Sequence, residues 1–265
     1  MGNSNQVQPG ELVVLIGSPR ALKFGKLIRE STICVLCGER LAATKEHIPP
    51  AALFIKKPQE YLLVPACDSC NSSTKLDDEH LVQVMAAASP WGQGVDVWKT
   101  KVAPKLKTRP RTRAGLRNRL ITYPLNVKPW GTLPLIGMKI ERARIHTSAW
   151  KLVSGLYWFH KGELLSKNVQ FTVTMLNVDQ LVAHFNDPDG KRYFRQTEPG
   201  VYNDPEVRKT FFYYRGISQA ASLWYFFFYK QNVVIAGTEV PGQTVDGQAS
   251  PNEGMQPAAQ KPGGG

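Results

Sequence analysis

The sequence lacks any apolar run long enough to cross a bilayer. Its longest unbroken apolar run, Leu223–Tyr229, falls far short of the roughly 20 residues that a membrane-spanning helix needs. The first residues, MGNSNQVQPGE, also lack the positively charged start of a secretory signal. We therefore expect a cytoplasmic protein without a membrane partner. At 265 residues, the chain is long enough to bury a sizeable core in one or two domains.

Cysteine is scarce, and its 4 occurrences all fall in two Cys-x-x-Cys pairs. Thiols stay reduced in the cytoplasm, so such pairs indicate metal ligands before they indicate disulfides. Four thiolates form the closed ligand set of a structural zinc site. Two disulfides or a redox-active pair are the alternatives. The predicted Zn²⁺ ligands are Cys34, Cys37, Cys67 and Cys70.

The residues around the two pairs predict a hairpin followed by a helix. Polar GERLAATKEHIPP follows the first pair, and the short apolar strand LLVP leads into the second. After Cys70, Asn71 with Ser72 or Ser73 predicts a helix cap. An apolar pattern with helical spacing then continues until SPWGQG ends it. The predicted unit is therefore strand, loop, strand and helix.

In order and spacing, the segments CVLCG, TKEHIPP, LLVPACDSCN and STKLDDEHL resemble the four-cysteine branch of the HNH nucleases. These proteins are also called ββα-metal or His-Me finger nucleases, and the resemblance covers about residues 31–90. It implies a metal-dependent endonuclease that hydrolyses phosphodiester bonds in DNA and leaves 5′-phosphate and 3′-hydroxyl ends. By this resemblance, His47 is the general base, while Glu46 and Asn71 hold a catalytic Mg²⁺ or Mn²⁺.

The chemistry of the reaction explains these residue types. A neutral imidazole can take a proton from water, and hard cations prefer oxygen ligands. Neighbouring residues in a strand point to opposite faces, so Glu46 and His47 can serve one site only where the backbone is irregular. Pro49 and Pro50 favour such a loop. Asp77, Asp78 and His80 are alternatives to Asn71 as the second metal ligand, although we expect His80 to be a solvated helix residue.

Acidic residues are absent from Val97–Ile140, whereas the whole chain has a net charge of +12. Basic residues at nearly alternate positions, with prolines among them, predict an extended arm that binds phosphates without reading bases. The partner is then DNA, or alternatively RNA. A solvated linker is the other interpretation of this segment. The predicted nucleic-acid contacts are Lys99, Lys101, Lys105, Lys107, Arg109, Arg111, Arg113, Arg117 and Arg119.

The second half of the chain predicts a mostly antiparallel sheet with one or two helices. SAWKLVSGLYWFHKGELL has the pattern of a helix, and the strands follow it. We expect the aromatic residues to form core, with a minority available to stack on bases, and His146, His160 and His184 to be structural. The predicted strands lie in VQFTVTMLNV, KRYFRQTEP, KTFFYYRGI, SLWYFFFYKQ and NVVIAGT, and NDPDG predicts a turn.

The predicted fold class is α+β: a zinc-stapled ββα-metal finger followed by a mostly antiparallel, β-rich α+β domain. A homodimer would let the single finger cut both strands. The alternative function is a non-catalytic zinc-binding module for nucleic acid or protein. The predicted divisions are 1–30, an N-terminal strand and helix; 31–90, the finger; 91–134, the basic arm; 135–237, the C-terminal domain; and 238–265, a disordered tail.

Overall fold

The structure is a computed structural model that describes residues 13–15, 33–56, 58, 60–127, 131–200, 202 and 205–242. The predicted N-terminal helix and nearly all of the predicted tail lie outside these residues. The fold class is confirmed as α+β with antiparallel sheets. Among the described residues, no helix is long and apolar enough to cross a membrane.

The finger consists of a three-stranded antiparallel sheet and the helices that follow it. Its elements are β1 (Val13–Leu15), β2 (Thr44–Ile48), η1 (Ala51–Leu53), β3 (Glu60–Ala66), α2 (Asp68–Ser73) and α3 (Lys75–Ala87). The strand order β1-β3-β2 makes β2 and β3 the predicted hairpin. The first helix begins earlier than predicted, because the Cys67 sulfur accepts the Cys70 amide and so acts as the helix cap.

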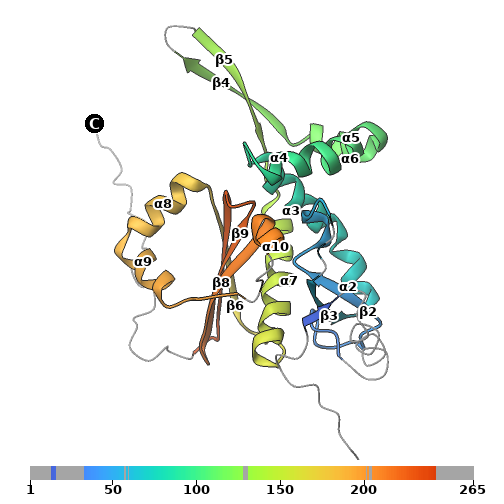
Figure 1. Cartoon of the computed structure of the whole chain (residues 1–265), viewed down its shortest axis with the longest axis vertical. Coiled ribbons are helices and arrows are strands. Elements are labelled where there is room, and N and C mark those ends of the chain that lie inside the picture. Colours follow the sequence, from blue (N-terminus) through green and yellow to red (C-terminus); the bar gives the residue numbers. More distant parts are fainter. Residues whose placement is uncertain are drawn as a thin grey trace, which may run out of the picture.

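The basic segment is helical, so the prediction of an extended arm is wrong. Pro104 and Pro110 lie in the first turns of α5 and α6, where a missing amide hydrogen costs no helical bond. After these helices, the antiparallel β4–β5 hairpin projects from the body of the molecule (Figure 1). The elements are α4 (Gln93–Val97), the π-helical turn η2 (Trp98–Val102), α5 (Ala103–Thr108), α6 (Pro110–Arg117), β4 (Leu120–Val127) and β5 (Gly131–Met138).

A long helix and a five-stranded antiparallel sheet make up the rest, with strand order β6-β10-β9-β8-β7. The strand predicted in KRYFRQTEP is wrong for most of its length. NDPDG begins a helix instead of a turn, because the Asp187 carboxylate accepts the Gly190 amide. The elements are α7 (Arg142–Lys161), β6 (Gln170–Leu176), α8 (Val178–Asn186), α9 (Pro188–Arg195), β7 (Glu198–Pro199), α10 (Pro205–Thr210), β8 (Phe211–Ile217), β9 (Ala221–Phe228) and β10 (Asn232–Glu239).

Helix α7 joins the finger to the sheet. It lies between them, while α8 and α9 cover the far face of the sheet (Figure 1). One apolar core runs from Ile48 of β2 through Leu156 of α7 to Trp224 of β9. A β-carbon on Gly155 would lie 2.6 Å from the Ile48 side chain, so a glycine is needed at this close approach. The predicted division near residue 135 falls inside β5 and does not interrupt this core.

Candidate metal centre and finger site

Four thiols converge at one end of the finger. Cys34 and Cys37 lie in the turn before β2, while Cys67 and Cys70 lie at the start of α2. Their sulfur atoms are all within 4.8 Å of one another, and none is in a disulfide. A tetrahedral zinc site with bonds of about 2.3 Å separates its sulfurs by about 3.8 Å. The donor set and its spacing therefore fit a metal ion such as zinc.

Amide hydrogens point at these sulfurs. The Cys70 amide donates to the Cys67 sulfur at 3.4 Å, and the Arg40 guanidinium donates to the Cys70 sulfur at 3.4 Å. Burial opposes ionisation of Cys37, but the amides of Arg40 and Glu39 outweigh it and lower its pKa to about 6. These donors favour the thiolate form of Cys37, which is the form that binds a metal, whereas burial raises the pKa of Cys34 and of Cys70.

The Glu46 carboxylate of β2 forms an ion pair with a buried lysine, Lys151. Glu46 is 6% exposed, and its Oε1 accepts a hydrogen bond from the Nζ of Lys151 in α7 at 3.2 Å. The same ammonium contacts the Asp78 carboxylate of α3. We call Glu46, Asp78 and Lys151 the Lys151 triad. Burial raises the pKa of Asp78 to about 6, against the lowering effect of Lys151.

The strand separates Glu46 from His47. Residues 44–48 are regular β-strand, paired with residues 62–66 of β3, so the predicted irregularity is absent from this segment. Glu46 and Ile48 are buried on the face that meets α7, while His47 is half-buried. Because side chains alternate along a strand, His47 lies on the face opposite Glu46. The structure therefore does not bring the two side chains to one point.

The candidates for a second metal ligand are held by other partners. The Asn71 amide nitrogen donates to the Thr44 hydroxyl at 3.1 Å and to the Lys45 carbonyl at 3.3 Å. Asp77 pairs with Arg144 at 3.3 Å. Of the predicted alternatives, Asp78 is therefore the one that shares a charged partner with Glu46.

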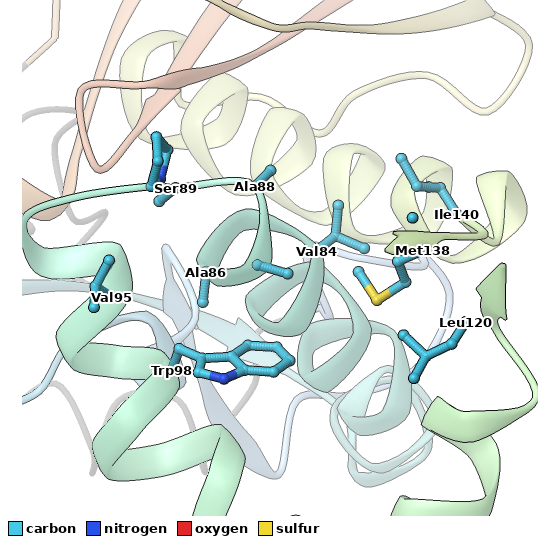
Figure 2. Close-up of a pocket in the computed structure, with 12 residues that line it drawn as sticks. Val84, Ala86, Ala88, Ser89, Val95, Trp98, Leu120, Met138 and Ile140 are labelled. Atoms are coloured by element: carbon cyan, nitrogen blue, oxygen red, sulfur yellow. The ribbon is translucent and has the colours of Figure 1, made fainter. Parts of the chain in front are cut away.

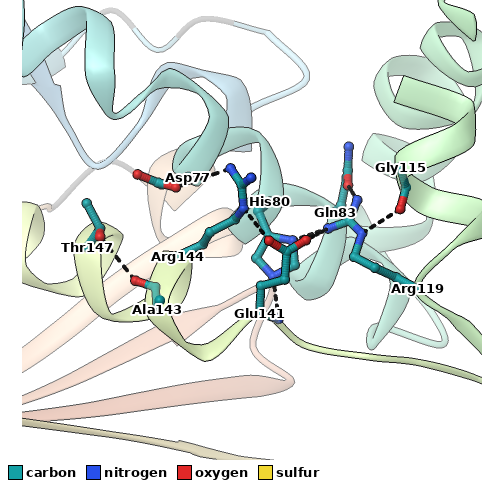
Figure 3. Close-up of polar contacts among 9 residues, drawn as sticks. All are labelled: Asp77, His80, Gln83, Gly115, Arg119, Glu141, Ala143, Arg144 and Thr147. Carbon is teal, nitrogen blue, oxygen red and sulfur yellow. Dashed lines mark hydrogen bonds and ion pairs between the residues drawn. The ribbon is translucent and has the colours of Figure 1, made fainter. Parts of the chain in front are cut away.

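His80 is buried, so the prediction of a solvated helix residue is wrong. It is 2% exposed and contacts the Arg119 guanidinium and the Glu141 amide (Figure 3). Burial and the nearby Arg119 lower the pKa of His80 to about 4, so the ring is neutral at neutral pH. Arg119 also donates to Gln83 at 2.6 Å. This network fixes the end of α6 to α3 and to the start of α7.

The nine predicted phosphate contacts divide into three anchoring residues, five exposed cations and Arg109, which lies between these two sets. Lys101 donates to the Phe54 carbonyl, Lys105 pairs with Glu79 at 2.9 Å, and Arg119 belongs to the network around His80. These three anchor the segment to the finger. Arg109 is exposed and lies 3.9 Å from Glu79. The exposed cations that have no ion-pair partner among the described residues are Lys99, Lys107, Arg111, Arg113 and Arg117; we call these the exposed cations.

The remaining histidines and the main cavity carry no second cluster of ionisable groups. His160 and His184 contact the hydroxyls of Tyr213 and Tyr225, which is consistent with structural roles. A cavity of about 580 Å³ opens between α3, α4 and the base of the β4–β5 hairpin (Figure 2). Trp98 and Met138 line it, and none of its lining residues is ionisable.

Lys151 is the residue that the sequence interpretation missed. It lies in an apolar helix and 105 residues from Glu46, so no local motif connects the two. The available signal is a lone lysine flanked at i−3 and i+4 by Ser148 and Gly155. Small residues at this spacing lie on one helix face and indicate close packing.

Comparison of the chain with protein-family models, with curated proteins and with solved structures finds no match. A function is therefore argued from the residues and their geometry.

Proposed function

We propose that this protein is a zinc-stapled, HNH-type endonuclease directed at DNA, or alternatively RNA, with His47 as its general base. One observation carries the proposal: an antiparallel β2–β3 hairpin is followed by α2 and α3, and four thiols converge where the hairpin and α2 meet. This is the arrangement that the HNH resemblance implies. The zinc would be structural, because four thiolates leave no position open for water.

The role proposed for His47 is proton transfer. A half-buried imidazole on the outer side of β2 is of the type that accepts a proton from an attacking water. A Mg²⁺ or Mn²⁺ ion on Glu46 and Asn71 does not fit the contacts found, because Lys151 holds the Glu46 carboxylate. We therefore assign no step to such an ion in this conformation.

The exposed cations are the proposed contact to the phosphate backbone. They extend along η2, α5 and α6, beside a finger to which other basic residues of the same segment are anchored. Such a surface neutralises phosphates without reading sequence. A homodimer remains the prediction for double-strand cleavage.

The nuclease is tested by incubating supercoiled plasmid with the zinc-loaded full chain in Mg²⁺ and then in Mn²⁺. Nicking is expected, and it should disappear in His47→Ala. The matched control is His146→Ala, an exposed histidine on α7 outside the finger, which should nick like the wild type. Nicking that persists in His47→Ala would contradict the role of His47.

The nucleic-acid surface is tested separately by measuring affinity for a DNA duplex as a function of salt. The Arg113→Ala/Arg117→Ala variant should weaken binding and reduce the slope of log K against log[salt] by about 1.8 if each side chain neutralises one phosphate. Lys161→Ala/Lys191→Ala removes two exposed cations from other helices and is the control. Equal losses in both variants would show that only overall charge matters.

The second candidate function is a non-catalytic zinc-stapled module that binds nucleic acid. The observation that favours it is the Glu46–Lys151 contact, because a carboxylate paired with an internal ammonium is not free to hold a metal. This candidate predicts full duplex binding with no nicking in either metal. It also predicts that His47→Ala changes neither the duplex binding nor the absence of nicking.

A further inference from the structure

Lys151 occupies the space between two carboxylates that come from different parts of the finger. Glu46 reaches it from β2 and Asp78 from α3, while Lys151 itself belongs to α7. The lysine is 1% exposed, so it is not a surface side chain that happens to lie nearby. A buried ammonium is costly unless it is paired, and here both partners are carboxylates.

A pair of carboxylates that lie against one cation is also a suitable ligand set for a divalent metal ion. Mg²⁺ and Mn²⁺ bind through one or two protein carboxylates together with water or substrate oxygens. In this structure the ammonium is in contact with both groups, and α7 covers the position from the side of the sheet. The close approach at Gly155, one turn further along α7, holds the helix against β2.

We propose that Lys151 is a built-in cation that takes the place of a divalent ion between Glu46 and Asp78. The cation position of this finger is therefore formed by Glu46 and Asp78, with Lys151 closing it, while Asn71 braces α2 against β2. The inference concerns the same finger as the proposed nuclease, but it can be tested without any cleavage. A finger closed in this way binds Mn²⁺ at Glu46 only after the ammonium has been removed or withdrawn.

The experiment measures Mn²⁺ binding to the zinc-loaded full chain by calorimetric titration. The wild type and Glu46→Gln should give the same isotherm, because Glu46 is already neutralised. Lys151→Met keeps the length of the side chain without its charge and should gain one further Mn²⁺ site. That site should be lost again in Lys151→Met/Glu46→Gln and in Lys151→Met/Asp78→Asn.

Two results would overturn the proposal. The first is a Mn²⁺ site in the wild type that Glu46→Gln removes, because Lys151 would then not exclude the ion. The second is a folded Lys151→Met protein that gains no site. If Lys151→Met does not fold, Lys151→Gln, which also removes the charge, is titrated in its place, and the same two results apply.

Failure of the proposed nuclease activity can be distinguished from failure of the proposal for Lys151. A Lys151→Met protein that binds Mn²⁺ through Glu46 but does not nick plasmid would support the built-in cation and argue against catalysis. Nicking by the wild type that requires Glu46 would support catalysis and argue against the built-in cation.

Discussion

The two ends of the finger treat positive charge in opposite ways. At the cysteine end, four thiols converge, and the Arg40 guanidinium donates to the Cys70 sulfur from the exposed side. At the carboxylate end, Glu46 and Asp78 converge on Lys151, which belongs to the chain itself. The cysteine end could thus hold a metal ion such as zinc, whereas the carboxylates of the other end are paired with a lysine of the chain itself.

The two ends therefore differ in what holds them together. If the four thiols hold a structural metal ion, the fold of this end depends on that ion, because the unliganded thiolates would repel one another or become protonated. At the carboxylate end, Glu46 and Asp78 are both paired with Lys151, so this end depends on the position of α7. The same short finger could thus be tied at one end by a metal ion such as zinc, and it is tied at the other end by α7, whose Lys151 lies 73 residues after Asp78.

The largest effect is expected from removing the metal at the cysteine end. Structural zinc contributes roughly 10–16 kcal/mol of apparent binding free energy in small zinc fingers, and this energy supports folding. Cys67→Ser, or treatment with a strong chelator, should therefore unfold the finger. Circular dichroism and thermal unfolding, with and without Zn²⁺, measure this. A chelated protein with an unchanged unfolding midpoint would show that the thiols are not a structural site.

The next largest effect is expected from Lys151→Met in the absence of Mn²⁺. Removing one partner of a buried ion pair leaves the other charges unpaired and costs about 3–5 kcal/mol. Lys167→Met is the matched control, because its pair with Glu39 is largely exposed and should contribute little to stability. Urea unfolding of both variants gives the comparison. Similar losses in the two would mean that the Lys151 triad is no tighter than a surface pair.

A smaller effect is expected where α7 approaches β2. Gly155→Ala places a methyl group 2.6 Å from the Ile48 side chain and should destabilise the protein by about 1–3 kcal/mol through overpacking. Gly115→Ala in α6 has nothing within 4 Å and should instead stabilise its helix by about 0.5–1 kcal/mol. Thermal unfolding distinguishes the destabilisation expected for Gly155→Ala from the stabilisation expected for Gly115→Ala. Stabilisation by Gly155→Ala would show that α7 is not held tightly against β2.

The smallest effect is expected for Asn71, which connects the two ends. Its amide nitrogen ties α2, just after the last cysteine, to the backbone just before Glu46. Asn71→Ala should cost about 1 kcal/mol, as for loss of an ordinary hydrogen bond, and leave Mn²⁺ binding unchanged. Calorimetry and urea unfolding measure the two quantities. Loss of a Mn²⁺ site in this variant would indicate that Asn71 is a metal ligand.

The sequence predicted the local parts of this arrangement well. The spacing of the cysteines and the apolar strand before Cys67 were sufficient to predict the hairpin, the convergence of the thiols and the helix after them. The strands at β6, β8, β9 and β10 were predicted because their β-branched and aromatic residues are a local signal.

The parts that failed depend on contacts distant in sequence or on context. His80 was taken as solvated because its neighbours are charged, but Arg119 and α7 bury it. The basic segment was taken as extended because of its prolines, which are equally suited to the first turn of a helix. Lys151 carries no motif at all, so its partner on β2 appears only once the helix is placed against the finger.

The most direct test of the contrast between the two ends is native mass spectrometry of the full chain after equilibration with both Zn²⁺ and Mn²⁺. The account predicts a mass increase of one Zn²⁺ and no retained Mn²⁺ for the wild type. A species that also retains Mn²⁺, and that is missing from Glu46→Gln, would contradict it.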